Sequence, residues 1–215
     1  MGGKTQFGNV VNRKKSILCA GFAVLLLITG YGCGGKSTVG ENQTFLKDSR
    51  DGKRYKTVQV GAKTWMAQNL NYAANNSACY ENKASCAKYG RLYNWDAAKG
   101  ACPAGWHLPS SAEWTELIGY AGGSSMAGKR LKSTTGWYGE YGKGNGTDYY
   151  GFSALPGGYG YNEVFRNAGQ YAYWWCVTEY DAGNASSRSM DHYNENVFKA
   201  TRDKAYMFSV RCVQD

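Results

Sequence analysis

The chain has 215 residues, of which 43% are hydrophobic, and this size and composition predict one folded domain or at most two. Three prolines are too few for a polyproline or low-complexity chain, and no repeat or heptad pattern indicates a solenoid or a coiled coil. The formal net charge is +9, but four basic residues lie in the first 32 positions, and the other 21 are interspersed with 16 acidic ones. Because nucleic-acid-binding domains concentrate their basic residues in one patch, we expect no nucleic-acid partner.

Residues 1–32 have the pattern of a secretory signal peptide of the lipoprotein type. Basic residues end at Arg13-Lys14-Lys15, an apolar run follows from Ile17 to Ile28, and small residues come after it. A helix over this apolar run covers only about 18 Å, whereas the hydrocarbon core of a membrane is about 30 Å thick. The pattern therefore favours an export signal over a transmembrane helix.

Cys33 lies between two glycines in a segment that resembles the lipobox of bacterial lipoproteins, in which the cysteine is lipidated. Gly30 and Tyr31 depart from that pattern, which most often has leucine and a small residue at these positions. We expect lipidation of Cys33, and the alternative is cleavage near Gly30 or Gly32 to give a soluble product. Residues 33–44 then form a lipid anchor and a polar tether that reaches at most about 40 Å. The expected location is the outer membrane or the cell surface.

Five cysteines follow the predicted anchor, and the oxidising compartment of an exported protein favours disulfides among them. We expect Cys79 and Cys86 to close a local loop, and Cys102 and Cys212 to connect the middle of the domain to its last strand. Cys176, the odd cysteine, lies in an aromatic stretch and is expected to be a buried free thiol. No Cys-x-x-Cys pair occurs and the chain has only two histidines, so we expect no metal and no cofactor.

The first elements predicted along the domain are a β-hairpin and a loop. Residues 54–60 are rich in β-branched and aromatic side chains, which are typical of a strand. Gly61-Ala62 provides a two-residue turn into a second strand at residues 64–66. Residues 75–90 are expected to form a loop around the first two cysteines of the domain.

Two helices are predicted next. Asn94 is a suitable N-cap for a short helix over residues 95–102, which a proline ends. Ser110 and Glu113 have the spacing of a capping box, which predicts the start of a second helix. This helix presents one apolar face and stops at Gly122-Gly123. Its apolar face is made of Trp114, Leu117, Ile118 and Ala121.

For the C-terminal half, the sequence predicts one loop followed by strands. Residues 136–151 are rich in glycine and tyrosine and predict a long surface loop. Short helices followed by several strands are typical of an α+β fold. The strands are predicted at residues 152–155, 171–178, 187–190, 196–198 and 206–213.

An ordered set of motifs runs from Thr44 to Asp215. They are Asp51-Gly52-Lys53-x-Tyr55-Lys56-Thr57-Val58, Trp65-Met66-Ala67-x-Asn69-Leu70-Asn71-Tyr72, Gly90-Arg91-Leu92-Tyr93-x-Trp95-x-Ala97-Ala98, Cys102-Pro103-x-Gly105-Trp106-His107-Leu108-Pro109, Gly151-Phe152-Ser153-Ala154-Leu155-Pro156-Gly157-Gly158 and Phe208-Ser209-Val210-Arg211-Cys212-Val213.

This set resembles the Fibrobacter succinogenes major paralogous domain, a family of exported proteins, over residues 45–215. The resemblance implies a C-type-lectin-like or formylglycine-generating-enzyme-like fold. The expected fold class is therefore α+β, as a C-type-lectin-like domain with two short helices packed on antiparallel sheets, disulfides and long loops. Cys176 stands where the family usually has serine.

The composition of the C-terminal half favours a non-catalytic binding or adhesion module, because Tyr, Asn and Ser combine contact area with adaptable hydrogen bonding. The expected partner is an extracellular carbohydrate, such as plant fibre, or a surface protein. The lectin signatures Glu-Pro-Asn and Gln-Pro-Asp are absent, which argues against calcium-dependent sugar binding. The candidate ligand-binding residues are Tyr180, Asn184, Arg188, His192, Tyr193, Asn194 and Arg202.

Two other functions fit the sequence. The first is a structural or assembly protein of the cell envelope. The second is an enzyme related to the formylglycine-generating oxidases, but those use paired reactive cysteines and here Cys176 is alone. Neither Gly-x-Ser-x-Gly nor His-Glu-x-x-His occurs, and pairing among Asp148, Glu179 and Asp191 would be needed for carboxylate chemistry. We therefore expect no catalytic residues.

Overall fold

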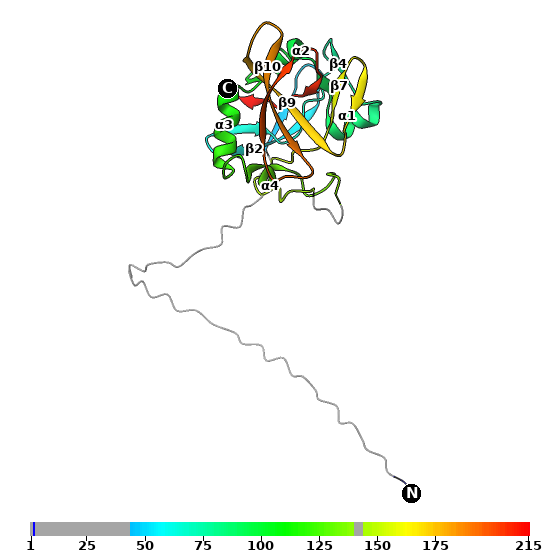
Figure 1. Ribbon diagram of the computed structural model, residues 1–215, viewed down its shortest axis with the longest axis vertical. Coiled ribbons are helices and arrows are strands. Elements are labelled where there is room, and N and C mark those ends of the chain that lie inside the picture. Colours follow the sequence, from blue (N-terminus) through cyan, green and yellow to red (C-terminus); the bar gives the residue numbers. More distant parts are fainter. Residues whose placement is uncertain (1, 3–43, 140–143) are drawn as a thin grey trace, which may run out of the picture. The chain divides into compact units, whose positions relative to one another are not determined.

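The computed structural model describes Gly2 and residues 44–139 and 144–215 (Figure 1). Five strands form its first sheet. All pairings in this sheet are antiparallel. The predicted hairpin is confirmed, because Thr57 pairs with Met66 and Val60 with Lys63 across the glycine turn. The order across the sheet is β1 (Phe45–Lys47), β2 (Arg54–Val60), β3 (Lys63–Met66), β13 (Val213–Gln214) and β6 (Trp106–His107).

Six strands form the second sheet, in which all pairings are antiparallel except the parallel one between β9 and β12. A separate hairpin of β7 (Tyr159–Tyr161) and β8 (Val164–Arg166) reaches this sheet through backbone hydrogen bonds between Gly160 and Met207. The order across the second sheet is β11 (Phe198–Asp203), β10 (Asn184–Asp191), β9 (Tyr171–Glu179), β12 (Phe208–Ser209), β5 (Leu92–Tyr93) and β4 (Ser77–Ala78).

The predicted strands of the C-terminal half are only partly right. The two at 171–178 and 187–190 exist and are longer, as β9 and β10. The one at 196–198 is shifted to β11, and the one at 206–213 is split between β12 and β13, which belong to different sheets. Residues 152–155 form no strand, because only Ala154 makes a bridge, to Lys132.

Four helices occur in the described part of the chain, where the sequence predicted two. The two predicted ones are α2 (Trp95–Lys99) and α3 (Ser111–Tyr120). The side chain of Asn94 accepts a hydrogen bond from the Ala97 amide at 2.9 Å, and both bonds of the predicted capping box are present. The helix α2 ends at Lys99, before the predicted end at residue 102.

The other two helices correct the prediction. The helix α1 (Lys83–Tyr89) lies within the stretch 75–90 that was expected to be a loop, and the Asn82 side chain caps it by accepting from the Ser85 amide. The helix α4 (Ala127–Leu131) has no side-chain cap, and it is held by the burial of its apolar residues. The domain is therefore built mainly of β-sheet with four short helices, within the predicted α+β class.

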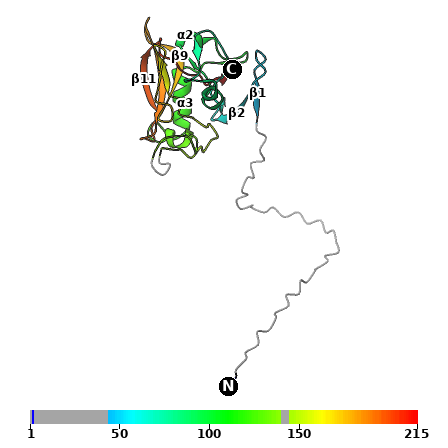
Figure 2. The same cartoon turned by 90° about the vertical axis from the view of Figure 1, so that its right-hand side faces the viewer.

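The helix α3 lies between the two sheets (Figure 2). Its Trp114 contacts Trp65 of the first sheet and Trp174 of the second, with ring centroids 5.2 Å and 5.7 Å apart. The loop predicted at residues 136–151 is not wholly superficial, because the buried Trp137 donates its Nε1–H to the Ala154 carbonyl. Burial of these aromatic rings is the main stabilising contribution between the layers.

A buried cation also connects the layers. Arg211 is fully enclosed, and burial lowers its pKa to about 9, so the guanidinium stays charged at neutral pH. It donates to the Asn69 side-chain oxygen and to the carbonyls of Phe152 and Ser153. These hydrogen bonds offset the cost of burying the charge.

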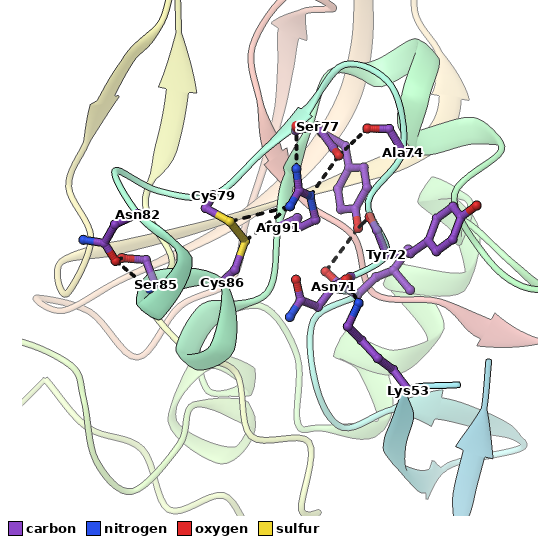
Figure 3. The surroundings of a disulfide bond; sticks show 12 residues. Lys53, Asn71, Tyr72, Ala74, Ser77, Cys79, Asn82, Ser85, Cys86 and Arg91 are labelled. Atoms are coloured by element: carbon purple, nitrogen blue, oxygen red, sulfur yellow. Dashed lines mark hydrogen bonds between the residues drawn. A yellow bond between two sulfur atoms is a disulfide. The ribbon is translucent and has the colours of Figure 1, made fainter. Parts of the chain in front are cut away.

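Both predicted disulfides are present, and Cys176 is a buried free cysteine as expected. Figure 3 shows the Cys79–Cys86 bond beside Arg91. The Arg91 guanidinium donates to both sulfur atoms, at 3.6 Å and 3.9 Å, and to the Ser77 hydroxyl and carbonyl. Arg91 thus attaches the disulfide to the β4 edge of the second sheet.

The predicted signal peptide at residues 1–32, lipidation of Cys33 and the tether up to residue 43 lie outside the described residues, apart from Gly2. Among the described residues, no helix is long and apolar enough to cross a membrane.

Candidate ligand-binding site

The strand β9 carries aromatic rings on both of its faces. Its side chains alternate, as in any strand, so Trp174 and Cys176 point to the core shared with α3. Tyr171 and Tyr173 therefore lie on the opposite face, where they are only half-buried. This second face holds the candidate site.

A cavity of about 320 Å³ opens on this face. Its aromatic rings are nearly parallel in two places: Tyr171 and Tyr173 have centroids 6.0 Å apart at 13°, and Tyr173 and Phe208 have centroids 5.0 Å apart at 17°. Residues from β7, β9, β11 and β12 contribute, together with two from the connections between strands. The lining is Tyr159, Asn167, Tyr171, Tyr173, Arg202, Tyr206 and Phe208. We call this the tyrosine cavity.

The hydroxyls of the tyrosine cavity are available to a ligand. In the described ranges, the tyrosine hydroxyls that bond to protein belong to other residues, Tyr55, Tyr80, Tyr93 and Tyr150. Burial raises the pKa of Tyr173 to about 12, so its hydroxyl stays protonated at neutral pH. Each such hydroxyl both donates and accepts hydrogen bonds.

Arg202 is the only charged residue that lines the tyrosine cavity. It is exposed on β11, and its side chain donates to the Thr201 carbonyl at 3.2 Å. No ion pair involves Arg202 within residues 44–139 and 144–215. Its guanidinium therefore keeps most of its five N–H donors for solvent or a ligand.

Other predicted site residues lie around the tyrosine cavity. The His192 ring packs against Tyr171, with ring centroids 6.1 Å apart, and against Tyr193, with ring centroids 3.6 Å apart. Tyr193 is 73% exposed. The Asn194 side chain donates to the Asp191 carboxylate, which fixes the turn that follows β10. These residues extend the aromatic surface beyond the cavity, although His192 itself is buried.

Tyr180 and Asn184 lie elsewhere, at the β9–β10 connection: Tyr180 directly follows β9, and Asn184 is the first residue of β10. Tyr180 is 70% exposed, and neither residue lines the tyrosine cavity. The Asn184 side chain donates to the Asp181 carboxylate within the same turn. This pair is therefore separate from the residues grouped around the cavity.

Arg188 was predicted to contact a ligand, and its position in the structure corrects this. It lies in the middle of β10, is 1% exposed, and points to the face that packs on α3. Its guanidinium donates to the carbonyl and hydroxyl of Ser111 at 2.8 Å and 2.9 Å. Arg188 thus joins β10 to the start of α3, and no surface of it remains for a ligand.

Sequence reasoning missed six residues of the tyrosine cavity. Most of them lie in predicted strands, but the sequence did not show on which face of the sheet their side chains lie. The stretch around Tyr173 is aromatic at almost every position, so it shows no clear alternation. The alternation of tyrosine at positions 171 and 173 with the apolar Ala172 was the available signal. The missed residues are Tyr159, Asn167, Tyr171, Tyr173, Tyr206 and Phe208.

The groups considered for catalysis are all engaged in other contacts. Burial raises the pKa of the Cys176 thiol to about 12, so almost none of it is thiolate at neutral pH. Each of the three carboxylates has its own partner: Asp148 accepts from the Ser153 hydroxyl, Glu179 from Lys204, and Asp191 from the Tyr193 amide. Within the described residues, no group of His, Cys, Asp and Glu has the geometry to hold a metal ion.

The architecture and the cavity define an α+β domain with two disulfides and a tyrosine-lined cavity. Residues 58–214 match the model of the family described as the Fibrobacter succinogenes major domain, and the chain belongs to this family. Comparison with curated proteins and with solved structures gave no match.

Proposed function

We propose that this chain is an exported, non-catalytic binding module, and that a carbohydrate is the ligand of the tyrosine cavity. The observation that carries the proposal is the set of half-buried tyrosine rings whose hydroxyls have no partner among residues 44–139 and 144–215. A sugar ring has an apolar C–H face and a rim of hydroxyls. The tyrosine rings complement the apolar face of the sugar, and their hydroxyls together with Asn167 complement its hydroxyl groups.

The proposal includes attachment to the outer membrane or cell surface through a lipid on Cys33. The signal pattern of residues 1–32 and the two disulfides, which suit an oxidising compartment, support export. A tether over residues 33–44 would hold the domain within about 40 Å of the membrane. The ligand would then be extracellular, and the chain an adhesin.

We also propose that the fold is C-type-lectin-like. Two features support this: the last strand, β13, pairs with β3 close to the start of the domain, and the described residues between α4 and β7 form a long connection without helix or strand. Two disulfides in a domain of this size also suit an extracellular binding protein.

Binding to a glycan array, followed by titration calorimetry, tests the function. The protein is the exported chain with Cys33→Ser, so that no lipid interferes. Tyr173→Ala removes a ring at the centre of the tyrosine cavity, and we expect affinity to fall about thirtyfold or more. Tyr173→Phe keeps the ring and removes the hydroxyl, and we expect a loss of about two- to tenfold.

Tyr180→Ala is the matched control, because Tyr180 is exposed and does not line the tyrosine cavity. We expect it to bind like the parent. Loss of binding in Tyr180→Ala with retention in Tyr173→Ala would move the site to the β9–β10 turn. Absence of binding to any glycan would overturn the carbohydrate proposal and favour a protein partner in the cell envelope.

A further inference from the structure

The tyrosine cavity has one formal charge, and it is positive. The lining combines aromatic rings, hydroxyls, one amide and Arg202, and it contains no carboxylate. Nearby acids are already engaged: the buried Asp191 accepts from the amides of Tyr193 and Asn194, and Asp203 accepts from the Ala205 amide. A neutral ligand would leave the guanidinium without an anionic partner.

The register of the second sheet places Arg202 on the ligand-binding face. It pairs with Ala185, whose side chain belongs to the same core as Trp175 and Phe208. Lys199, three residues earlier on β11, pairs with Arg188 and so points to the opposite face. Burial raises the pKa of Tyr173 and the charge of Arg202 opposes that rise, which agrees with the two side chains being neighbours.

We propose that the ligand is an acidic carbohydrate, with a uronic acid unit in the tyrosine cavity and its carboxylate on Arg202. This inference rests on the proposed function and specifies its ligand class. The tyrosine rings would cover the face of the sugar. The guanidinium matches the planar carboxylate with two parallel hydrogen bonds, which a lysine does not provide.

Pairs of matched oligosaccharides test this inference. Tetramers of galacturonate, glucuronate and mannuronate are compared by calorimetry with the same tetramers after reduction of their carboxyl groups to alcohols. The protein is again the exported chain with Cys33→Ser. We expect at least one uronate to bind about tenfold or more tighter than its reduced partner, because a hydrogen bond to a charged group exceeds one to a neutral group.

Arg202→Gln should remove this preference, so that the acidic and reduced tetramers bind alike. Lys199→Gln removes the same charge from the same strand on the opposite face, and it should keep the preference. Arg202→Lys should retain only part of it, because the planar fork is lost. This set separates specific recognition from general attraction to a basic protein.

The outcomes distinguish the two proposals. Equal binding of acidic and reduced tetramers overturns the uronate assignment and leaves carbohydrate binding intact. If a sulfated tetramer binds tighter than every uronate, the uronate assignment is wrong, and the anionic group of the ligand is a sulfate ester. If neither acidic nor neutral tetramers bind, and the glycan array is also negative, both proposals fail together.

Discussion

His107 lies between two carboxylates and is a local determinant of stability. Its Nδ1 contacts the Asp215 carboxylate at 2.6 Å and its Nε2 contacts Glu113 at 2.9 Å. Burial lowers the pKa of His107, but these two bonds outweigh it and the net pKa is raised. For Glu113, burial acts to raise the pKa, and bonds from Ser110, His107 and Lys63 outweigh it to give a pKa of about 2.

The two shifts define a pH window. The raised pKa of His107 stabilises the fold fully below its ordinary value of 6.5, and this contribution is lost as pH rises through the raised pKa. The lowered pKa of Glu113 stabilises the fold fully above pH 4.5, and this contribution is lost as the pH falls towards 2. Both contributions are therefore complete between about pH 4.5 and 6.5.

We predict that the loss of the His107 contribution lowers the free energy of unfolding between pH 6.5 and 8.5. The decrease should be less than about 1 kcal/mol, because His107 and Glu113 are partly exposed. His107→Gln should flatten that fall. Urea denaturation of both proteins at three pH values across this interval measures it. An equal fall in the variant would show that His107 does not cause the pH dependence.

The helix α3 depends on its first turn, because it is only ten residues long. Ser110 accepts from the Glu113 amide, and the Glu113 carboxylate accepts from the Ser110 amide at 2.8 Å. Isolated helices of this length are marginal, so capping and packing on the two sheets both contribute. The Ser111 contact with Arg188 adds a connection from the same turn to β10.

Ser110→Ala should lower the free energy of unfolding by about 1 kcal/mol, because one helix amide loses its acceptor. Glu116→Ala, an exposed change in the same helix, should stay within about 0.5 kcal/mol of the parent. Chemical denaturation followed by tryptophan fluorescence compares them. A Ser110→Ala effect no larger than that of the control would mean that the cap adds nothing measurable.

Elements with a strong local signal were predictable and the others were not. The glycine turn between β2 and β3, the Asn94 cap and the capping box are each set by neighbouring residues, and all three are present. The helices α1 and α4 have seven and five residues, too few for a periodic apolar pattern to be recognised. Tertiary contacts stabilise them instead.

The candidate site could not be predicted as a whole because it is non-local. Tyr173, Arg202 and Phe208 come from three strands of the second sheet and Tyr159 from the separate β7–β8 hairpin, so only the tertiary arrangement of these strands brings them together. Among the predicted candidates, Arg202 lines the tyrosine cavity, whereas Arg188 faces the core. These two arginines lie on strands whose faces the sequence did not distinguish, since their neighbours alternate weakly between polar and apolar.

At the scale of the whole molecule, the two disulfides close loops of very different length. Cys102 and Cys212 are separated by 110 positions and Cys79 and Cys86 by 7. The loss of unfolded-chain entropy grows with loop length, to about 5 kcal/mol for the longer loop and about 2 kcal/mol for the shorter one. The long bond also holds β13 in the first sheet, next to its partner β3.

The double variant Cys102→Ser/Cys212→Ser should therefore lose about 5 kcal/mol of stability, and Cys79→Ser/Cys86→Ser about 2 kcal/mol. Thermal unfolding under oxidising conditions ranks the two variants against the parent. The reverse order would show that the Arg91 contacts at the short disulfide outweigh chain entropy.

The long disulfide also determines how the domain carries mechanical load. Every residue of the tyrosine cavity lies between Cys102 and Cys212, so the cavity belongs to a covalent ring. A pull between a captured ligand and the N-terminal side of the domain enters this ring at Cys102. The disulfide connects Cys102 to Cys212, which follows Phe208 closely in the chain. Tension can unfold residues that precede Cys102, but the disulfide prevents it from extending the ring. The proposed binding module would therefore retain its ligand while β1, β2 and β3 unfold.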